Sequence, residues 1–321
     1  MGRARAEVVA DGVGRLNPGD RMNIAIDPIG QSFAAAVSGI DCREPLEPDI
    51  VAAIDAAMDQ YAVLVYRDQA LTDDQQLAFT LHFGEIEKKG RGSGKGRIHF
   101  RTDNQARALA TGIGDFSNID GAGAPLTPET RAYQFKLADR LWHSDSSFRP
   151  VPAKYSLLSG RAVPSWGGNT EFADMRAAYD ALDERTKREV EGLVCLHSQV
   201  YSREAVGFGE MDEAERAAFK PVRQSLVRRH PVTGRKSLFL SSHAGVVENW
   251  SIPESRMFLR DLMEFATQPQ FVYSHAWQVH DLVVWDNRAT MHRGRRFDPS
   301  EPRDVRQTRL AGDVATAEQL D

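Results

Sequence analysis

The sequence predicts a mainly β protein, with one domain that has a β-sandwich core and helices on its outside. From about residue 98 to residue 173, short strand-like runs alternate with turn residues, as expected of two packed sheets. Two further strand-length runs close the chain, at residues 281–285 and at about residues 304–310. The 321 residues contain no internal repeat and no low-complexity linker, which favours one domain over two.

The start of the chain differs in character from the rest. Residues 1–21 are rich in glycine, arginine and small side chains and show no periodicity, which predicts a flexible N-terminal arm. A cleaner pattern begins at Met22, so Met22 is a candidate native start, and a functional arm is the alternative. The predicted domain therefore spans residues 22–321.

Helical and strand signals follow in order. Apolar residues recur on one helical face after Pro48: Ile50, Val51, Ile54 and Met58. The apolar run at residues 62–66 predicts a buried strand. Thr72, followed three residues later by Gln75, is a capping-box pattern that predicts the start of a second helix.

The middle of the chain predicts a loop and an insert. Residues 90–96 form a basic glycine-rich loop, which suits a lid because glycine permits hinge conformations. Asp174 is expected to cap a helical stretch that runs to about Gly192, and another helix follows Pro253. We therefore predict a helical insert at about residues 174–270, between the two halves of the metal site described below.

Composition excludes several classes of protein. Hydrophobic residues make up 41% of the chain and charged residues 26%, as in ordinary globular proteins. A net charge of −5 offers no basic field for nucleic acid, and the apolar runs are too short to cross a membrane. No secretion signal opens the chain, and Cys42 and Cys195 form no disulfide framework. We expect a cytoplasmic protein whose partner is a small molecule.

The strongest functional signal is the pair His143 and Asp145, answered much later in the chain by His292. Residues two apart on a strand or tight turn point to the same side, so His143 and Asp145 can converge on one ion. Two histidines and one carboxylate form the facial triad that binds Fe(II) and leaves positions open for a cosubstrate and O2. Because chance alone gives roughly half a His-x-Asp pair in such a chain, a hydrogen-bonded core histidine is the alternative for His143 alone.

Arg303, eleven residues beyond His292, extends this signal to a cosubstrate. 2-Oxoglutarate binds iron through its C1 carboxylate and C2 ketone, and its C5 carboxylate then needs a cation and a hydroxyl. Arg303 can grip that carboxylate with two hydrogen bonds, and Thr170 is the hydroxyl candidate. The alternatives are a surface arginine at position 303 and a zinc hydrolase, which uses the same metal ligands but needs neither residue. The pattern favours a 2-oxoglutarate-dependent oxygenase.

Longer segments resemble the taurine dioxygenase family of Fe(II)/2-oxoglutarate oxygenases, and within it the 2,4-dichlorophenoxyacetate dioxygenase subgroup. The matching segments are residues 141–148, 167–172, 174–182, 281–287 and 292–298. The resemblance extends over about residues 22–312. It implies a double-stranded β-helix, or jelly-roll, core.

The resemblance also implies roles for single residues. It places five of them on the cofactors, with His143, Asp145 and His292 on Fe(II), and Thr170 and Arg303 on 2-oxoglutarate. Asn118 falls on a strand that lines the active site of the family, so we expect it in the substrate pocket. A homo-oligomer is a further expectation from the family alone.

One position departs from the family. Members that take small anionic substrates carry a second arginine four residues beyond the cosubstrate arginine, and here that position is Gln307. Glutamine can donate a hydrogen bond to an anion but has no charge, so its contact with the anion is weaker than a charge-assisted one by roughly 1 to 2 kcal/mol. Three interpretations follow. In the first, Arg309, on the same strand face, takes the place of the missing arginine and binds a longer substrate. In the second, the basic loop with Lys88, Lys89 and Arg91 closes over the anion. In the third, the substrate is not an aryloxyacetate.

The reaction implied by the resemblance is hydroxylation of a small organic acid. Hydroxylation of a carbon that bears an ether oxygen gives a hemiacetal that collapses. An aryloxyacetate such as 2,4-dichlorophenoxyacetate then yields a phenol and glyoxylate, with succinate and CO2 as coproducts. The alternatives are the same chemistry on another small carboxylate or sulfonate, such as taurine, and a non-catalytic jelly-roll binding protein with a residual metal site.

Overall fold

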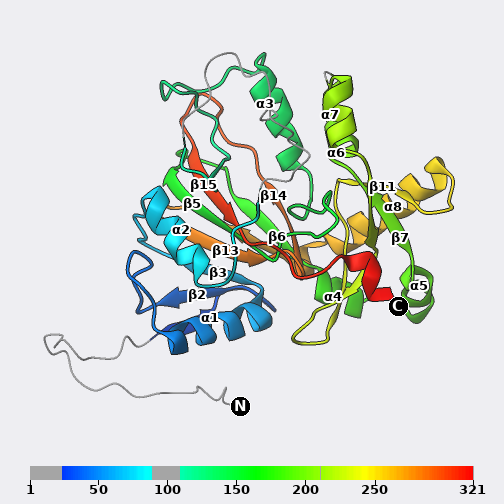
Figure 1. The fold of residues 1–321 in the computed structure, drawn as a ribbon, viewed down its shortest axis with the longest axis horizontal. Coiled ribbons are helices and arrows are strands. Elements are labelled where there is room, and N and C mark those ends of the chain that lie inside the picture. Colours follow the sequence, from blue (N-terminus) through cyan, green and yellow to red (C-terminus); the bar gives the residue numbers. More distant parts are fainter. Residues whose placement is uncertain (1–23, 89–108, 210, 321) are drawn as a thin grey trace, which may run out of the picture.

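Two facing sheets form the centre of the protein (Figure 1). The computed structural model describes residues 24–88, 109–209 and 211–320. The predicted arm at residues 1–21 and the glycine-rich loop at residues 90–96 lie outside the described residues. The mainly β core that the sequence predicts is confirmed.

The larger sheet has the strand order β1-β2-β3-β13-β5-β15-β4, and all neighbours are antiparallel except β2 and β3. Its strands are β1 (Ala25–Pro28), β2 (Ala35–Ser38), β3 (Val63–Tyr66), β13 (Leu282–Asp286), β5 (Tyr155–Ala162), β15 (Asp304–Arg309) and β4 (Gly114–Asp115). The smaller sheet is antiparallel, with the order β12-β6-β14. Its strands are β12 (Val272–His275), β6 (Thr170–Asp174) and β14 (Thr290–Gly294).

The larger sheet is buried on both faces. Side chains alternate along a strand, so Val63 and Val65 of β3 pack between the sheets against Phe172 of β6. Leu64 and Tyr66 point the other way, into the core under the N-terminal helices. This double burial explains the uninterrupted apolar run that predicts β3.

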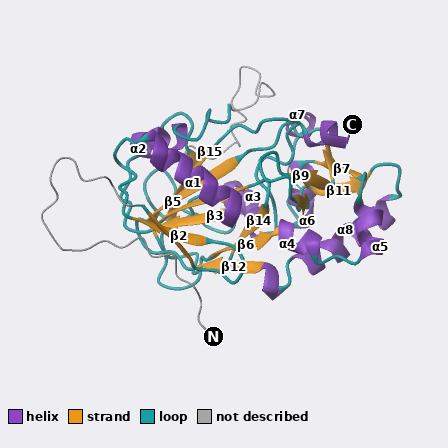
Figure 2. Ribbon diagram, turned by 90° about the horizontal axis from the view of Figure 1, so that it is seen from below, coloured by secondary structure: helices purple, strands orange, loops and turns teal. Residues whose placement is uncertain are grey.

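The helices α1 (Pro48–Tyr61) and α2 (Asp73–Leu81) cover the outer face of the larger sheet (Figure 2). Both helices begin as the sequence predicts. Pro48 occupies the first turn of α1, and Thr72 and Gln75 form the predicted capping box of α2. The buried residues of α1 are Ile50, Ile54, Ala57 and Met58.

The expected alternation of strands at residues 98–173 is wrong in its middle. Between β4 and β5, the described chain forms the helix α3 (Arg131–Lys136) and the 3-10 helix η1 (Leu137–Arg140). The hydroxyl of Thr130 accepts a hydrogen bond from the backbone N–H of Tyr133 and so caps α3. This local cap and the packing of η1 on β14 override the short strand-like runs of the sequence.

The region of the predicted insert lies beside the sandwich (Figure 1). It contains strands as well as the expected helices. The helices are α4 (Met175–Asp180), α5 (Glu184–Val190), α6 (Gln199–Ala205), α7 (Glu213–Ala218) and α8 (Ile252–Ala266). The strands are β7 (Val194–His197), β8 (Val222–Ser225), β9 (Val227–Arg229), β10 (Lys236–Leu238) and β11 (Ala244–Val247).

Local caps set the helices of this region. Asp174 caps α4 as predicted, but the helix ends at Asp180, and Asp183 caps a separate helix, α5. Ser251 forms a capping box at the start of α8. The short 3-10 helices η2 (Pro269–Phe271) and η3 (Thr316–Leu320) complete the described elements. No helix within the described ranges is long and apolar enough to cross a membrane.

We expect Leu64→Ala to lower the free energy of unfolding by about 2 to 5 kcal/mol, because it leaves a cavity at a fully buried site under α1 and α2. Urea unfolding measures the change. Leu81→Ala is the control, since Leu81 is 56% exposed at the end of α2, and it should shift stability by less than about 0.5 kcal/mol. Equal losses in the two variants would contradict this placement of the core.

Candidate active site

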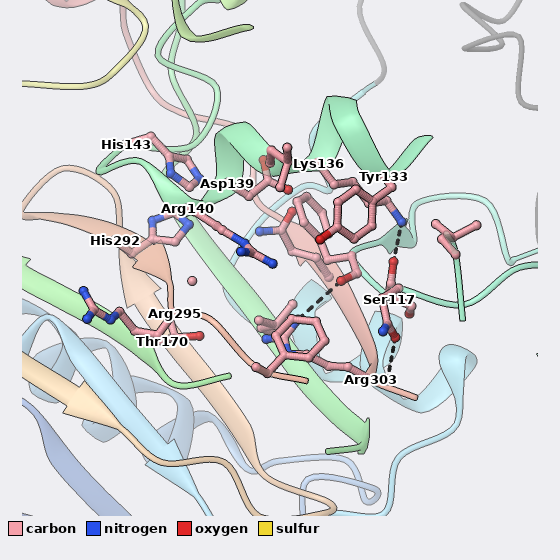
Figure 3. A pocket seen from close by; sticks show the side chains of 18 of the residues that line it. Ser117, Tyr133, Lys136, Asp139, Arg140, His143, Thr170, His292, Arg295 and Arg303 are labelled. Carbon is pink, nitrogen blue, oxygen red and sulfur yellow. Dashed lines mark hydrogen bonds between the residues drawn. The ribbon is translucent and has the colours of Figure 1, made fainter. Parts of the chain in front are cut away.

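A backbone bridge places His143 beside His292. The segment that follows η1 pairs with β14 through two hydrogen bonds, of 2.9 Å from the His143 N–H and 2.8 Å from the His292 N–H. Directly opposed residues of an antiparallel pair project from the same face. The two imidazoles therefore point into one cavity, with ring centroids 4.2 Å apart (Figure 3).

Asp145 completes a cluster of three possible metal ligands. One ligand atom from each of His143, Asp145 and His292 lies within 4.8 Å of the others, and all three residues are buried. The Nδ1 atom of His143 lies 2.8 Å from the Leu141 carbonyl oxygen, which can only accept, so Nδ1 carries the proton and Nε2 is left as the metal donor. The Nε2 atom of His292 lies 4.0 Å from Asp145 Oδ2. Two nitrogen donors and one carboxylate fit a two-histidine, one-carboxylate iron site.

The protonation states of the cluster suit a divalent cation. Burial, aided by nearby His143, lowers the pKa of His292 to about 3, although Asp145 acts in the opposite direction. Burial by itself raises the pKa of Asp145, but His292, Arg309 and a hydrogen bond from Ser156 outweigh it and hold that pKa below its ordinary value. A neutral imidazole and an ionised carboxylate are the forms that bind a metal.

A hydrogen-bond network fixes the carboxylate of Asp145. Its Oδ2 atom accepts from Ser156 Oγ at 2.7 Å and from Gln307 Nε2 at 2.8 Å. Asn287 accepts from the Asp145 backbone N–H at 3.2 Å and donates to Ser156 Oγ at 2.9 Å. Trp285 in turn donates to Asn287 Oδ1 at 3.0 Å. Gln307, at the position of the family's second arginine, thus supports a possible metal ligand.

Arg303 is a buried cation whose charge is not paired. It lies just before β15, and its Nη1 donates to the Phe116 carbonyl at 3.4 Å. Among the described residues, no carboxylate lies within salt-bridge distance of its guanidinium. Burial lowers the pKa of Arg303 to about 10, so the side chain stays charged at neutral pH. Phe297 packs against the guanidinium, with its ring centroid 5.6 Å from Cζ. A buried, charged fork of this kind is suited to an anionic ligand.

Thr170 lies at the start of β6 and lines the same pocket as Arg303. Its hydroxyl accepts a hydrogen bond from Trp277 Nε1 at 3.0 Å, which leaves the hydroxyl proton free to donate. The loop before β6 is held close to the chain after β14. Gly167 has a φ of +69°, and a Cβ atom there would collide with the Arg296 carbonyl, so this position requires glycine.

One pocket joins these residues. It is lined by Phe116, Ser117, Asn118, Leu126, Tyr133, Lys136, Leu137, Asp139, Arg140, His143, Leu158, Thr170, Trp285, His292, Gly294, Arg295, Phe297, Arg303 and Gln307. Figure 3 shows that α3 and η1 form one wall and that the strands carrying His292 and Thr170 form the other. The pocket therefore combines the two histidines of the metal cluster, several cations and an aromatic surface.

The structure separates the predicted substrate residues. Asn118 lines the pocket, but its amide is committed to the backbone, because it donates to the Glu301 carbonyl at 2.9 Å and accepts from the Arg303 N–H at 2.7 Å. Asn118 thereby positions Arg303. Lys88 lies outside the pocket lining, with its side chain 90% exposed and 3.7 Å from a carboxylate oxygen of Glu85.

Arg309 is also absent from the pocket lining. Its guanidinium lies 3.3 Å from Glu87 and 3.7 Å from Asp145. Lys89 and Arg91, which complete the basic loop of the sequence prediction, lie outside the described residues.

Sequence reasoning missed the basic residues of α3 and η1. Lys136 and Arg140 both line the pocket, and Arg140 is only three residues before His143. Their spacing of four is the spacing that places two residues on one helical face. This helical spacing carries no weight in a segment that the sequence predicts to form strands, so the pair is missed.

We expect Asp145→Asn to weaken Mn(II) binding by more than the roughly 10- to 100-fold that follows loss of a residue supporting a ligand, because it removes the one anionic donor of the cluster. Electron paramagnetic resonance of free Mn(II) during a titration measures this affinity. Asp261→Asn, at an exposed site, is the control. Unchanged affinity in folded Asp145→Asn would show that the ion binds elsewhere.

Comparison with known proteins agrees with this geometry. The model of the family described as "Taurine catabolism dioxygenase TauD, TfdA family" matches residues 25–309. The alpha-ketoglutarate-dependent 2,4-dichlorophenoxyacetate dioxygenase of Cupriavidus pinatubonensis is 43% identical over 293 residues, which cover 91% of this chain and 99% of that protein. The (S)-phenoxypropionate/alpha-ketoglutarate-dioxygenase of Sphingobium herbicidovorans is 35% identical over 304 residues, which cover 91% and 96%.

Solved structures extend the likeness to the fold. The crystal structure of AAD-2 in complex with Mn(II) and N-oxalylglycine has a TM-score of 0.86 to this structure at 54% sequence identity, and the match covers 92% of this chain and 100% of that one. A taurine dioxygenase from Burkholderia xenovorans has a TM-score of 0.69 at 28% identity, and the match covers 91% of this chain and 90% of that one. The predicted jelly-roll core is confirmed, and the chain belongs to the TauD, TfdA family of dioxygenases.

Proposed function

We propose that this protein is an Fe(II)/2-oxoglutarate-dependent dioxygenase that hydroxylates a small aryloxyalkanoic acid and so cleaves its ether. The observation that carries the proposal is the convergence of His143, Asp145 and His292 beside a pocket that also holds the unpaired guanidinium of Arg303. A metal site alone fits many activities, but a metal site beside a buried cation fits a chelating cosubstrate with a remote carboxylate.

The metal ligands are assigned on their donor atoms. His143 and His292 would supply neutral nitrogens and Asp145 one oxygen, which leaves further coordination positions for 2-oxoglutarate and O2. When bound, iron and 2-oxoglutarate together reduce O2, so that one oxygen atom enters succinate, the other enters the substrate, and CO2 leaves. Ser156 and Gln307 hold the Asp145 carboxylate in a fixed rotation throughout.

The cosubstrate residues are assigned on charge and hydrogen-bonding capacity. Arg303 would pair with the C5 carboxylate of 2-oxoglutarate, and the Thr170 hydroxyl would donate to the same group. Asn118 fixes the backbone of Arg303, so the guanidinium is held in place before the ligand arrives. Such preorganisation lowers the entropy that binding would otherwise cost.

The pocket walls favour an aromatic acid. The pocket lining includes six aromatic and aliphatic side chains, namely Phe116, Leu126, Tyr133, Leu158, Trp285 and Phe297. Trp285 and Phe172 both pack against His292, with ring centroids 4.6 Å and 6.1 Å from it, and these apolar rings keep water from that part of the site. The named relatives act on 2,4-dichlorophenoxyacetate and (S)-phenoxypropionate, and both compounds combine an aryl ether with a carboxylate.

The products follow from the position of hydroxylation. An aryloxyacetate hydroxylated on the carbon beside its ether oxygen becomes a hemiacetal, which breaks the C–O bond and releases a phenol and glyoxylate. A cytoplasmic location and a homo-oligomeric assembly remain predictions.

The first test is turnover of a panel of aryloxyacetates, aryloxypropionates and alkyl sulfonates with Fe(II), 2-oxoglutarate and O2. We expect succinate and phenol to form in equal amounts with an aryloxyalkanoate. Substrate-coupled succinate with an alkyl sulfonate alone would move the activity to a taurine-like substrate. Absence of succinate from every reaction of metal-loaded protein would favour a non-catalytic binding protein.

The second test concerns the cosubstrate. Arg303→Gln should raise the KM for 2-oxoglutarate by roughly 10- to 100-fold, because it removes the one charge assigned to the C5 carboxylate. Arg306→Gln, three residues further along in β15, is the matched control, since Arg306 pairs with Asp73 and Asp304 and does not line the pocket. Equal KM values for the Arg303 variant and the native protein would refute the assignment.

A further inference from the structure

The pocket holds a second arginine whose guanidinium has no partner among the described residues. Arg140 lines the cavity, and no hydrogen bond or ion pair joins it to another described side chain or carbonyl. The other basic residues of the lining are engaged. Lys136 Nζ donates to the Ser117 carbonyl at 2.5 Å, and Arg295 lies 3.5 Å from the Glu171 carboxylate. A charged fork in a pocket, with all its donors free, is available for an anion.

Its position in the fold points Arg140 at the reacting centre. Arg140 is the last residue of η1, and the bridge between His143 and His292 begins three residues later. In Figure 3 the side chain of Arg140 extends into the cavity, between His292 and Arg303 in this view. The two arginines are close enough that Arg140 contributes, after burial, to the lowered pKa of Arg303, while Asp139 opposes that shift.

With metal and cosubstrate bound, the charge of Arg140 has no counterpart among the groups assigned to the site. Fe(II), the Asp145 carboxylate, dianionic 2-oxoglutarate and Arg303 together carry no net charge. Asp139, the acidic residue nearest to Arg140 in sequence, also lines the pocket and lies 3.7 Å from Arg203. Arg140 is half-buried, and its guanidinium still has no anion beside it among the described residues. A monoanionic substrate supplies that charge.

The residues that the sequence suggests for binding a substrate anion make other contacts in the structure. Gln307 gives an N–H to Asp145 and carries no charge. Arg309 lies against Glu87 and Asp145 and does not line the pocket. The cation for a substrate carboxylate therefore has to come from the wall opposite β15, and α3 and η1 form that wall (Figure 3).

We propose that Arg140 binds the carboxylate of the substrate and so sets the specificity of this enzyme for anionic aryl ethers. The inference rests on the proposed function. With the carboxylate held on η1, the aryl group lies along the aromatic lining, and Gln307 is free to keep Asp145 in position. Substrate recognition and support of the metal ligand are thus divided between two walls.

The experiment compares two ligands of similar shape that differ in charge, phenoxyacetate and 2-phenoxyethanol. Isothermal titration calorimetry on protein loaded with Mn(II) and 2-oxoglutarate gives their Kd values without turnover. Arg140→Gln should raise the Kd of phenoxyacetate by roughly 10- to 100-fold and that of 2-phenoxyethanol by less than about twofold. Arg140→Lys, which keeps the charge, should recover part of the loss. Arg216→Gln, on the exposed surface of α7, is the control.

Kinetics with Fe(II) supply the second readout. Arg140→Gln should raise the KM for the aryloxyacetate and leave the KM for 2-oxoglutarate unchanged. An unchanged Kd for phenoxyacetate, an equal loss for both ligands, or a rise confined to the KM for 2-oxoglutarate would each overturn the inference. Failure of native protein to bind phenoxyacetate would overturn it as well. Tight, Arg140-dependent binding without any succinate would sustain the inference and refute the proposed reaction.

Discussion

The site depends on one short piece of backbone pairing, the bridge between His143 and His292. Its two hydrogen bonds join a segment that follows η1 to β14 of the smaller sheet, although the two residues are far apart in the chain. Because opposed residues share a face, the bridge alone brings two imidazoles within 4.2 Å. It also carries η1 to the mouth of the pocket, so the same contact that assembles the metal cluster positions Arg140.

Burial strengthens the electrostatic interactions of the charged groups in this site. Asp145 is ionised in a buried position because Ser156 and Gln307 donate to it and positive groups lie nearby. The guanidinium of Arg303 is buried and donates to one carbonyl among the described residues, so its charge is available to a ligand. In water these interactions would be weak, but low-dielectric surroundings strengthen each of them and make an unmatched charge costly.

The two walls of the pocket divide the chemistry. The strand wall, with β14 and β15, carries a possible metal ligand, the cation that we propose for the cosubstrate and the glutamine that supports Asp145. The wall of α3 and η1 carries Arg140 and faces the space where a substrate would lie. Because the sheets are packed on both faces, the strand wall has little freedom to change. A peripheral helix can vary without disturbing the core, so substrate choice is better placed there.

The sequence by itself determined the elements whose signals are local or long. The capping box at Thr72, the apolar run of β3 and the pattern of His143, Asp145 and His292 each depend on neighbouring residues or on chemistry that few other functions need. The family motifs in the sequence also predicted the jelly-roll core. Tertiary structure alone decided how side chains from distant segments are used. Whether Gln307 contacts substrate or Asp145, whether Arg309 reaches the pocket, and which cation stays unpaired depend on three-dimensional contacts that spacing along one strand does not contain. For the same reason α3 and η1 were mistaken for strands, and Arg140 was not found.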